Sequence, residues 1–349
     1  MRTAQRSQER VRPLLTPREI YSYLDTYIVG QERAKRTVAI AAYNHLKRCQ
    51  LSPSNKRLIK KSNILLIGPT GCGKTHLARK LAECLDVPFT IADATEYTEA
   101  GYYGKDIEVM VAELLFRANH SIEECQRGIV FIDEIDKIAR RCQWGRSGPT
   151  ARDIGGEGVQ QALLKLLEGR QIFVPLNVTQ HWSKHDFVQV DTTDILFIAA
   201  GTFSDLYEYA PTRPIGFGQT SDAQQAELRI GPQQLLDYGM LAELLGRLPV
   251  QVQLQPLSED QLLEVMTGPP DCLVREYTQL LALDAVSLHF EEEALRCIAR
   301  YALSRRIGAR GLRAVFEEVC HDLMFEAPER RGETLSVSSR YIEERLARL

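Results

Sequence analysis

A glycine-rich run of eight residues largely decides how this chain folds. It reads Gly68-Pro69-Thr70-Gly71-Cys72-Gly73-Lys74-Thr75 and matches the pattern G-x-x-x-x-G-K-[ST]. Apolar residues precede it and helical spacing follows it, which is the strand–loop–helix context that the pattern requires. The glycines let backbone N–H groups wrap phosphates at a helix N-terminus, while Lys74 can reach the β- and γ-phosphates and Thr75 can ligate Mg²⁺. The sequence therefore predicts a P-loop nucleotide site.

A second motif supplies two carboxylates. It reads Ile129-Val130-Phe131-Ile132-Asp133-Glu134, in which four apolar residues form a buried strand that ends in Asp133 and Glu134. We expect Asp133 to hold the Mg²⁺ shell and Glu134 to orient and polarise an attacking water. A kinase or a GTP switch needs no adjacent glutamate, so the pair favours an ATPase.

The hydrophobic pattern predicts an α/β fold with a parallel sheet flanked by helices. Short apolar runs are mostly continuous instead of alternating, which is typical of strands that are covered on both faces. We expect these strands at residues 63–67, 87–92, 129–132, 195–200 and 249–254. Crossover helices are expected over residues 75–85, 106–118 and 159–167.

Capping signals divide the rest of the chain. Thr16 and Glu19 predict a capping box at the start of a helix, and a second helix is expected over residues 31–48. Ser258 and Gln261 form another such pair, after which the chain is mainly helical. We predict a flexible arm over residues 1–15, a large nucleotide-binding domain over 16–255 and a small helical domain over 256–349.

Composition excludes several classes of protein. The 349 residues carry 43 basic and 46 acidic side chains, a net charge of −3, so a strongly basic nucleic-acid binder is not expected. No apolar run approaches the roughly 18 residues of a membrane span, and the first 15 residues lack the apolar core of a signal peptide. The eight cysteines form no C-x-x-C pair, so we expect no zinc site and a cytoplasmic location.

Two arginines are candidates for the positive charge that a P-loop ATPase needs near the γ-phosphate. Arg247 lies just before the last expected strand, and Arg310 lies between two glycines. Taken alone, each is more typical of a surface or ion-pair arginine. Within an ATPase, Arg247 would come from a neighbouring subunit and Arg310 from the small domain of the same chain.

Together these motifs resemble the ClpX family of AAA+ protein unfoldases, which feed proteins to the ClpP peptidase. The resemblance is carried by residues 27–31, 68–75, 129–137, 156–165 and 308–313. It implies a homohexameric ring with ATP bound between subunits. It also implies that Ile28, Val29 and His76 contact the nucleotide, that Arg247 is the arginine finger acting in trans, and that Arg310 is the sensor-2 arginine. Sensor 1 is expected at Thr202.

Two further segments resemble the loops by which this family handles its partners. Gly101-Tyr102-Tyr103-Gly104 is similar to the first pore loop, and Arg152 with Asp153 is similar to the second. Ile215, Gly216 and Phe217 lie in a segment similar to the loop that docks on ClpP. The resemblance thus implies an ATP-driven unfoldase and translocase without peptidase activity of its own. It would thread unfolded or tagged proteins and deliver them to a ClpP-type peptidase.

Several residues depart from the family pattern. The first 15 residues contain no cysteine, so the N-terminal zinc-binding domain is expected to be absent or truncated. The family's basic Arg-Lys-His loop is not readable at residues 178–184, and the segment around Ile215 is shortened. Lys105 stands where an acidic residue is expected and predicts a cationic ring beside the pore. Cys72 lies at a helix N-terminus, where a thiol pKa tends to fall, so a reactive thiol is a second hypothesis.

Three other functions stay open from the sequence. A stand-alone remodelling chaperone would use the same ATPase without a peptidase. A nucleotide-switched scaffold or adaptor would bind ATP without turnover, and Glu134 and Arg247 argue against it. A DNA-remodelling AAA+ protein would need a basic face, which the overall charge does not support.

Overall fold

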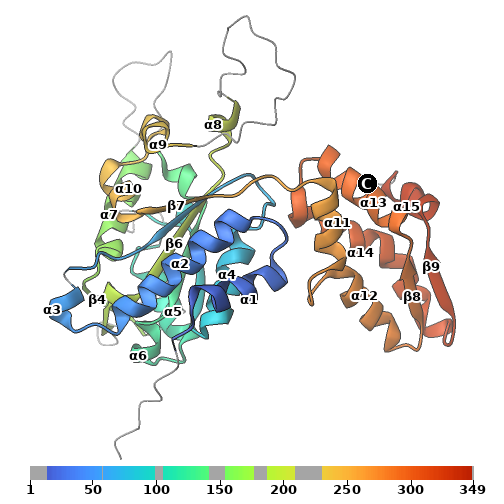
Figure 1. Cartoon of the computed structure of the whole chain (residues 1–349), viewed down its shortest axis with the longest axis horizontal. Coiled ribbons are helices and arrows are strands. Elements are labelled where there is room, and N and C mark those ends of the chain that lie inside the picture. The colour runs from blue at the N-terminus through green and yellow to red at the C-terminus, as the bar shows by residue number, and fades with distance from the viewer. Residues whose placement is uncertain are drawn as a thin grey trace, which may run out of the picture.

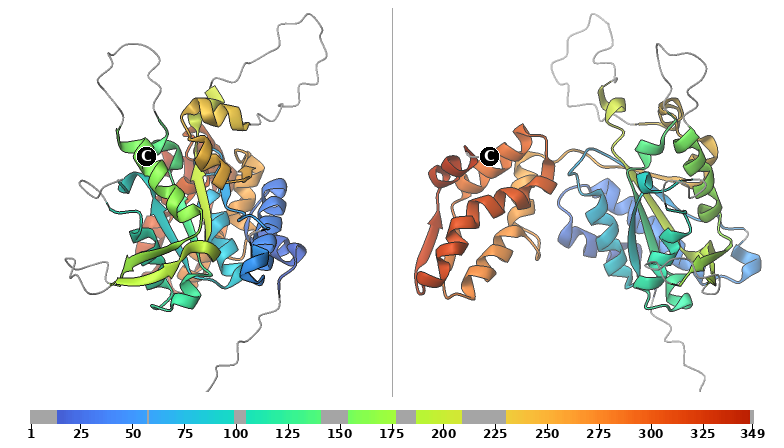
Figure 2. Two further views of the ribbon diagram at one scale, coloured as in Figure 1. Left: turned by 90° about the vertical axis from the view of Figure 1, so that its left-hand side faces the viewer. Right: turned by 180° about the vertical axis from the view of Figure 1, so that it is seen from behind.

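The chain folds into a sheet-containing part and a mainly helical C-terminal part. The computed structural model describes residues 14–56, 58–98, 105–140, 154–176, 187–208 and 230–347. The two parts lie beside each other, joined by the segment between β7 (Val250–Gln253) and α11 (Glu259–Thr267) (Figure 1). The view from behind, at the right of Figure 2, shows the same two separate lobes.

The five main strands form one parallel sheet in the order β2-β3-β6-β1-β7. Besides β7, these strands are β1 (Ile64–Ile67), β2 (Phe89–Asp93), β3 (Ile129–Asp133) and β6 (Leu196–Gly201). In the central register, Leu65 of β1 lies opposite Ala199 of β6 and Gln251 of β7. The predicted fold class is confirmed, and each expected strand lies within two residues of its predicted start.

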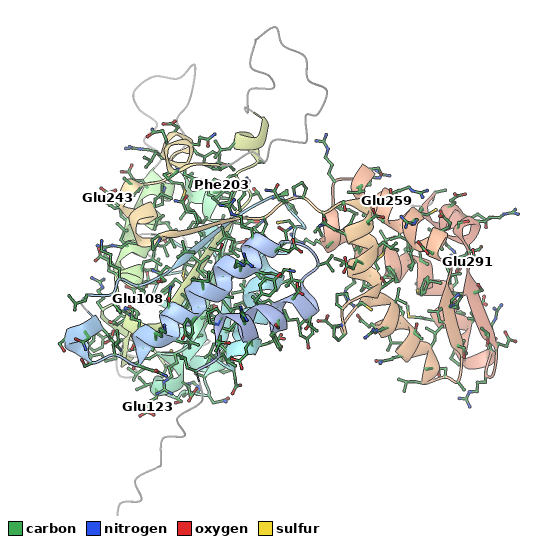
Figure 3. All side chains as sticks on the ribbon, in the orientation of Figure 1. Glu108, Glu123, Phe203, Glu243, Glu259 and Glu291 are labelled. Atoms are coloured by element: carbon green, nitrogen blue, oxygen red, sulfur yellow. The ribbon has the colours of Figure 1, made fainter. Side chains whose placement is uncertain are left out.

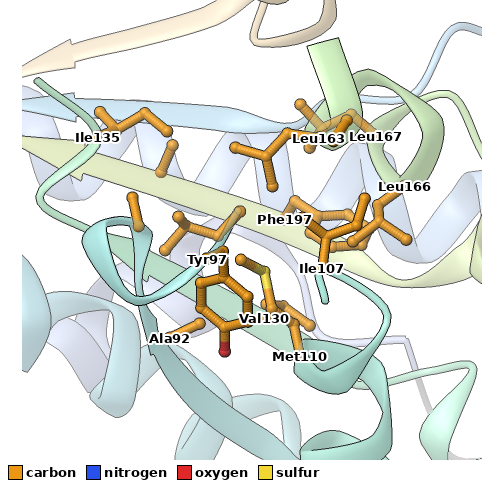
Figure 4. Close-up of a cluster of buried hydrophobic side chains, with 14 of the residues drawn as sticks. Ala92, Tyr97, Ile107, Met110, Val130, Ile135, Leu163, Leu166, Leu167 and Phe197 are labelled. Atoms are coloured by element: carbon orange, nitrogen blue, oxygen red, sulfur yellow. The ribbon is translucent and has the colours of Figure 1, made fainter. Parts of the chain in front are cut away.

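Both faces of the sheet are buried, which explains why the strands read as continuous apolar runs. Ile64 and Leu66 face a core formed with α1 (Pro17–Tyr27), α2 (Glu32–Cys49) and α4 (Lys74–Leu85). Leu65 and Ile67 face a second core on the opposite side of the sheet. Its helices are α5 (Val109–Arg117), α7 (Ile154–Leu167), α9 (Pro232–Tyr238) and α10 (Ala242–Arg247). In this core, Phe197 of β6 packs beneath Leu163 and Leu166 of α7 (Figure 4).

The capping predictions are confirmed, whereas several helix starts differ from expectation. The Thr16 hydroxyl oxygen accepts a hydrogen bond from the Glu19 N–H at 3.3 Å, and the Glu19 carboxylate accepts one from the Thr16 N–H at 2.7 Å, so the capping box is present. The helix expected over 106–118 begins only at Val109, while α7 begins five residues before the expected 159. The sequence 154–158 contains three glycines, and their low intrinsic helix propensity concealed this start.

A two-stranded antiparallel ribbon was not expected from the sequence. Strand β4 (Gln171–Pro175) pairs with β5 (Phe187–Asp191), and Ile172 lies opposite Val190. Alternation is the signal that was missed, since Ile172 and Val174 are buried whereas Phe173 is 65% exposed. Short helices also occur at α3 (Pro53–Lys56), α6 (Ile122–Cys125) and α8 (Ser204–Glu208).

The C-terminal part has its own core. Five helices surround a small parallel pair of strands, β8 (Ser287–Phe290) and β9 (Thr334–Val337). Besides α11, the helices are α12 (Leu273–Ala282), α13 (Glu292–Ser304), α14 (Gly308–Glu326) and α15 (Ser339–Leu346). Phe316 centres the core, with ring centroids 5.7 Å from Tyr277 and 5.4 Å from Phe290. The division at residue 255 stays a prediction.

Charged side chains lie on the outside of both parts of the molecule (Figure 3). The Ser258–Gln261 capping box is present at the start of α11, and Glu259 lies in the first turn of this helix (Figure 3). Glu243 occupies the first turn of α10, and carboxylates at such positions complement the helix dipole. Among the described residues, no helix combines the length and the apolar character that crossing a bilayer would need.

Candidate active site

The P-loop leaves the carboxyl end of β1 in a conformation that only its glycines permit. The Gly68 N–H donates to the Gly201 carbonyl of β6 at 3.2 Å, which continues the sheet by one step. Gly71 and Gly73 have φ values of 76° and 97°, in the left-handed region that favours glycine. A Cβ on Gly68 would lie 2.8 Å from the Leu254 carbonyl oxygen. The loop is therefore held closely between β6 and the end of β7.

The Lys74 ammonium lies inside the turn of this loop. Its Nζ donates to the carbonyls of Gly68 at 2.7 Å and Pro69 at 3.0 Å, and the residue is 8% exposed. The positive charge thus stands at the amino end of α4, where the helix dipole also favours an anion. This is the arrangement that phosphate binding requires.

Thr75 and Asp133 come together from two elements 58 residues apart. The Thr75 hydroxyl donates to Asp133 Oδ2 at 3.3 Å, and Asp133 Oδ1 accepts the Glu134 N–H at 2.9 Å. Hydroxyl and carboxylate oxygens are the donors that Mg²⁺ prefers, so the pair fits the predicted metal. In the described part of the chain, no three His, Cys, Asp or Glu side chains gather as a metal site.

Glu134 has an unusual backbone conformation. Its φ of 55° and ψ of 33° are left-handed for a residue with a side chain, which costs about 1–2 kcal/mol. The side chain is exposed beside Asp133, where solvent water reaches it. Strain of this kind is often retained at functional positions.

The start of α14 packs directly on the P-loop. The Ala309 N–H donates to the Gly71 carbonyl at 3.1 Å, and a Cβ on Gly71 would lie 2.8 Å from Gly308 Cα. Arg310 is exposed in the first turn of this helix. The structure therefore brings this predicted arginine to the edge of the P-loop from the C-terminal part.

The predicted adenine-contact segment lies beside the same helix α4. Ile28 and Val29 are buried at the end of α1, and His76 is exposed in the first turn of α4. The Gln31 side chain exchanges two hydrogen bonds with the Gln255 backbone, at 2.7 and 3.0 Å. The P-loop, the α1–α2 turn and the start of α14 thus surround one region.

Arg247 is not part of that region. It ends α10, and its carbonyl accepts a hydrogen bond from Asn63, just before β1. The P-loop follows the other end of β1, and a strand of four residues spans about 13 Å. The Arg247 side chain is 50% exposed and pairs with Glu168 at 2.6 Å. Within one chain, Arg247 and the P-loop occupy opposite ends of the sheet.

Thr202, the expected sensor-1 residue, is hydrogen-bonded to Asp136, a residue that was not predicted from the sequence. Its hydroxyl donates to Asp136 Oδ2 at 2.8 Å, and the Phe203 N–H donates to the same oxygen at 3.3 Å. Asp136 is 4% exposed and lies three residues after Asp133. The signal available in the sequence was a third carboxylate, three residues after Asp133.

The structure argues against the reactive-thiol hypothesis for Cys72. The residue is 3% exposed, and burial raises the pKa of its thiol, which outweighs the opposing effect of the Lys74 ammonium. The Cys72 side chain packs against the backbone of Gly68, where a Cβ would lie 3.0 Å from its sulfur. Cys72 is therefore a small packing residue of the loop.

Lys105 is not the free cation that the cationic-ring prediction requires. Its ammonium contacts Glu96 at 2.9 Å and Glu113 at 3.5 Å, and the Glu96 contact raises the pKa of Lys105. Its backbone also bridges to Tyr97. Two carboxylates therefore balance the charge of the Lys105 ammonium.

The remaining predicted residues lie outside the described part of the chain. They are the pore residues Tyr102, Tyr103, Arg152 and Asp153 and the docking residues Ile215, Gly216 and Phe217.

Comparison with known proteins agrees with this geometry. Residues 59–251 match the family described as "AAA domain (Cdc48 subfamily)", and residues 257–335 match the "C-terminal, D2-small domain, of ClpB protein". An "ATP-dependent Clp protease ATP-binding subunit ClpX" from Treponema denticola is 43% identical over 344 residues, covering 94% of this chain and 82% of the relative. The corresponding "ClpX 2" of Wolinella succinogenes is 45% identical over 332 residues, with the same coverage. The chain belongs to the ClpX family.

Proposed function

We propose that this ATPase hydrolyses ATP at a site shared by two subunits of a hexameric ring. The observation that carries the proposal is the position of Arg247. It is half exposed at the end of the sheet away from the P-loop of its own chain, which supports a role at the site of another copy.

In this proposal the P-loop backbone and Lys74 bind the β- and γ-phosphates of ATP. Thr75 and Asp133 hold Mg²⁺, which supplies charge neutralisation between the phosphates when bound. Glu134 orients water for attack on the γ-phosphate and accepts its proton. Arg247 of the neighbouring copy stabilises the charge of the transition state, and such an arginine is worth roughly 10³–10⁵ in kcat.

Arg310 and the α1–α2 turn complete the nucleotide site. Arg310 lies in the first turn of α14, which packs on the P-loop, and would contact the phosphates from the C-terminal part. Ile28 and Val29 offer apolar surface to the adenine, next to His76 of α4. Because α14 packs on the P-loop, ATP binding and hydrolysis would move the C-terminal part against the sheet.

The mechanical role is that of a protein unfoldase and translocase. The relatives are named as ATP-binding subunits of an ATP-dependent Clp protease. We assign grip on the polypeptide to Tyr102 and Tyr103, with Arg152 in a second loop, and docking on a ClpP-type peptidase to Ile215, Gly216 and Phe217. The chain itself would cleave no peptide bonds.

A folded fluorescent reporter with an unstructured tail tests this function. Purified protein with ATP should abolish the fluorescence, and addition of a ClpP-type peptidase should yield peptides. Tyr102→Ala should retain ATP hydrolysis and lose unfolding. Unfolding without peptides would instead support the stand-alone remodeller. ATP turnover without any unfolding would contradict the proposal.

A further inference from the structure

One buried amide fixes two chain segments at the amino end of the sheet. Asn63 is 1% exposed, and its Nδ2 donates to the carbonyls of Arg247 at 3.0 Å and Leu167 at 3.4 Å. Its Oδ1 accepts the Phe197 N–H of β6 at 3.3 Å. All of its hydrogen bonds go to backbone groups, so this side chain sets the relative positions of α7, α10 and the sheet.

The two segments that Asn63 joins carry an ion pair. Glu168 follows Leu167 directly, and its Oε1 accepts from Arg247 Nη2 at 2.6 Å. The side chains are 48% and 50% exposed. An exposed pair of this kind gains little stability by itself. In this pair, however, the buried Asn63 side chain fixes the distance between the backbones that carry Glu168 and Arg247.

The ion pair occupies one side of the guanidinium only. Arginine has five N–H donors in a planar fork, and the Glu168 contact uses Nη2. The fork is thereby oriented at low entropic cost, because a planar group held at one edge has few remaining conformations. Among the described residues, Glu168 is the ion-pair partner of Arg247, so the other N–H donors of the guanidinium can face a phosphate that arrives from outside the chain.

We propose that Asn63 and Glu168 are positioning residues for Arg247, which they hold ready for the ATP of a neighbouring copy. Asn63 fixes the backbone of the arginine and Glu168 fixes its guanidinium. The inference rests on the proposed trans role of Arg247. It adds that two residues which contact neither ATP nor the reacting water determine the position of the guanidinium.

Glu168→Gln tests the proposal without disturbing the core, since Glu168 is half exposed. It keeps the shape and removes the charge that makes the hydrogen bond strong. We expect kcat for ATP hydrolysis to fall about tenfold with KM for ATP almost unchanged, as for an interaction used in the transition state. Glu344→Gln is the matched control, because Glu344 forms an exposed pair with Arg340 far from the site and should leave kcat unchanged.

Mixed rings separate a trans effect from a local one. A Glu134→Gln chain cannot hydrolyse ATP but presents an intact Arg247, so adding it should raise the turnover of Glu168→Gln chains and, as a reference, of Arg247→Ala chains. Asn63→Ser should be restored in the same way. The control is Ile298→Ala, which destabilises the core of the C-terminal part, and the added Glu134→Gln chain should not restore its turnover.

The outcomes distinguish the positioning role of Asn63 and Glu168 from the proposed trans role of Arg247. A wild-type kcat in Glu168→Gln overturns the positioning role. The same conclusion follows if Glu168→Gln is slow and the Glu134→Gln chain restores Arg247→Ala but does not restore Glu168→Gln. Failure to restore Arg247→Ala overturns the proposed function as well. Restoration of Arg247→Ala, Glu168→Gln and Asn63→Ser together supports the proposal.

Discussion

At the residue scale, the site depends on short contacts between groups from different elements. Asp133 is oriented on both oxygens, by the Thr75 hydroxyl and by the Glu134 N–H. Glu134 has a left-handed backbone, and its side chain is exposed to solvent. Metal binding and water activation are thus assigned to adjacent residues whose side chains face different surroundings.

Glu134→Gln tests the assignment of the base. The amide cannot accept the proton of the attacking water, so kcat should fall by about 10²–10⁴. ATP binding should persist, because the P-loop and Asp133 are unchanged. Isothermal titration with ATP and a steady-state turnover assay measure the two quantities. Turnover near the wild-type rate would remove Glu134 from the mechanism.

Cys72 should be a slow nucleophile. Burial excludes reagent, and the raised thiol pKa lowers the thiolate fraction at neutral pH. With iodoacetamide at pH 8, Cys72 should be modified more slowly than the partly exposed Cys297, and unfolding in urea should remove the difference. Peptide mass spectrometry gives the rates. Rapid modification of Cys72 in the folded protein would contradict its packing role.

His45 should make folding sensitive to acid. Burial, with the nearby cations Lys61 and Arg48, lowers its pKa to about 3, so the folded state keeps it neutral. Below about pH 6.5 the unfolded chain binds a proton that the folded chain refuses, so stability falls as pH falls from 6.5 toward 3, by up to about 1.4 kcal/mol per pH unit.

His45→Leu should remove this contribution. Urea unfolding at pH 7 and pH 5 gives the change in stability, and the loss on acidification should be smaller in His45→Leu than in wild type. The exposed His289→Leu serves as the control and should retain the wild-type loss. An unchanged loss in His45→Leu would contradict the neutral buried imidazole.

At the element scale, the contact between α14 and the P-loop joins the C-terminal part to the nucleotide site. Gly308 has a φ of 56°, and a Cβ there would lie 2.9 Å from Gly71 Cα and 3.0 Å from the Thr70 carbonyl oxygen. The start of the helix can approach the loop only because this residue has no side chain.

Gly308→Ala tests this contact against a matched variant. Gly332 has a φ of 86° and open space around its Cβ position, so Gly332→Ala adds only the backbone strain of about 1–2 kcal/mol. Gly308→Ala adds the same strain and a collision with the P-loop. Both variants should lower the thermal midpoint, and only Gly308→Ala should reduce ATP turnover. Equal turnover in both would mean that the contact has no functional role.

The elements were predictable to the extent that one local pattern defined them. Apolar runs predicted all five strands of the main sheet. The three inner strands β1, β3 and β6 are continuous because both of their faces are buried, whereas the edge strands β2 and β7 also contain polar residues. The β4–β5 ribbon was missed because half of its side chains are exposed, including Phe173 and Phe187. The start of α14 at Gly308 has no sequence signal, because glycine has a low helix propensity, whereas the close P-loop contact requires a residue without a side chain.

The site was predictable where a motif spans consecutive residues. Lys74, Thr75, Asp133 and Glu134 follow from two such motifs, and the structure brings them together. The hydrogen bonds of Asn63 reach partners 104, 134 and 184 residues away, and no spacing rule connects such positions. The ionic environment of Lys105 was likewise invisible, since Glu113 approaches it from another element.

At the scale of the whole molecule, the sheet separates two functional ends. The P-loop, Asp133 and Glu134 lie at the carboxyl ends of its strands, and Arg247 lies at the amino ends. The C-terminal part touches the first edge through α14. In the proposed function, one chain holds nearly all of an ATPase site and Arg247 of a neighbouring copy completes it, which would make activity a property of the assembly.

The dependence of ATP turnover on protein concentration tests this claim most directly. Turnover per chain should be close to zero in dilute monomer and rise in step with ring formation followed by analytical ultracentrifugation. Arg247→Ala should assemble over the same concentration range and stay inactive. Full turnover per chain in samples that sediment as monomers would contradict the shared site.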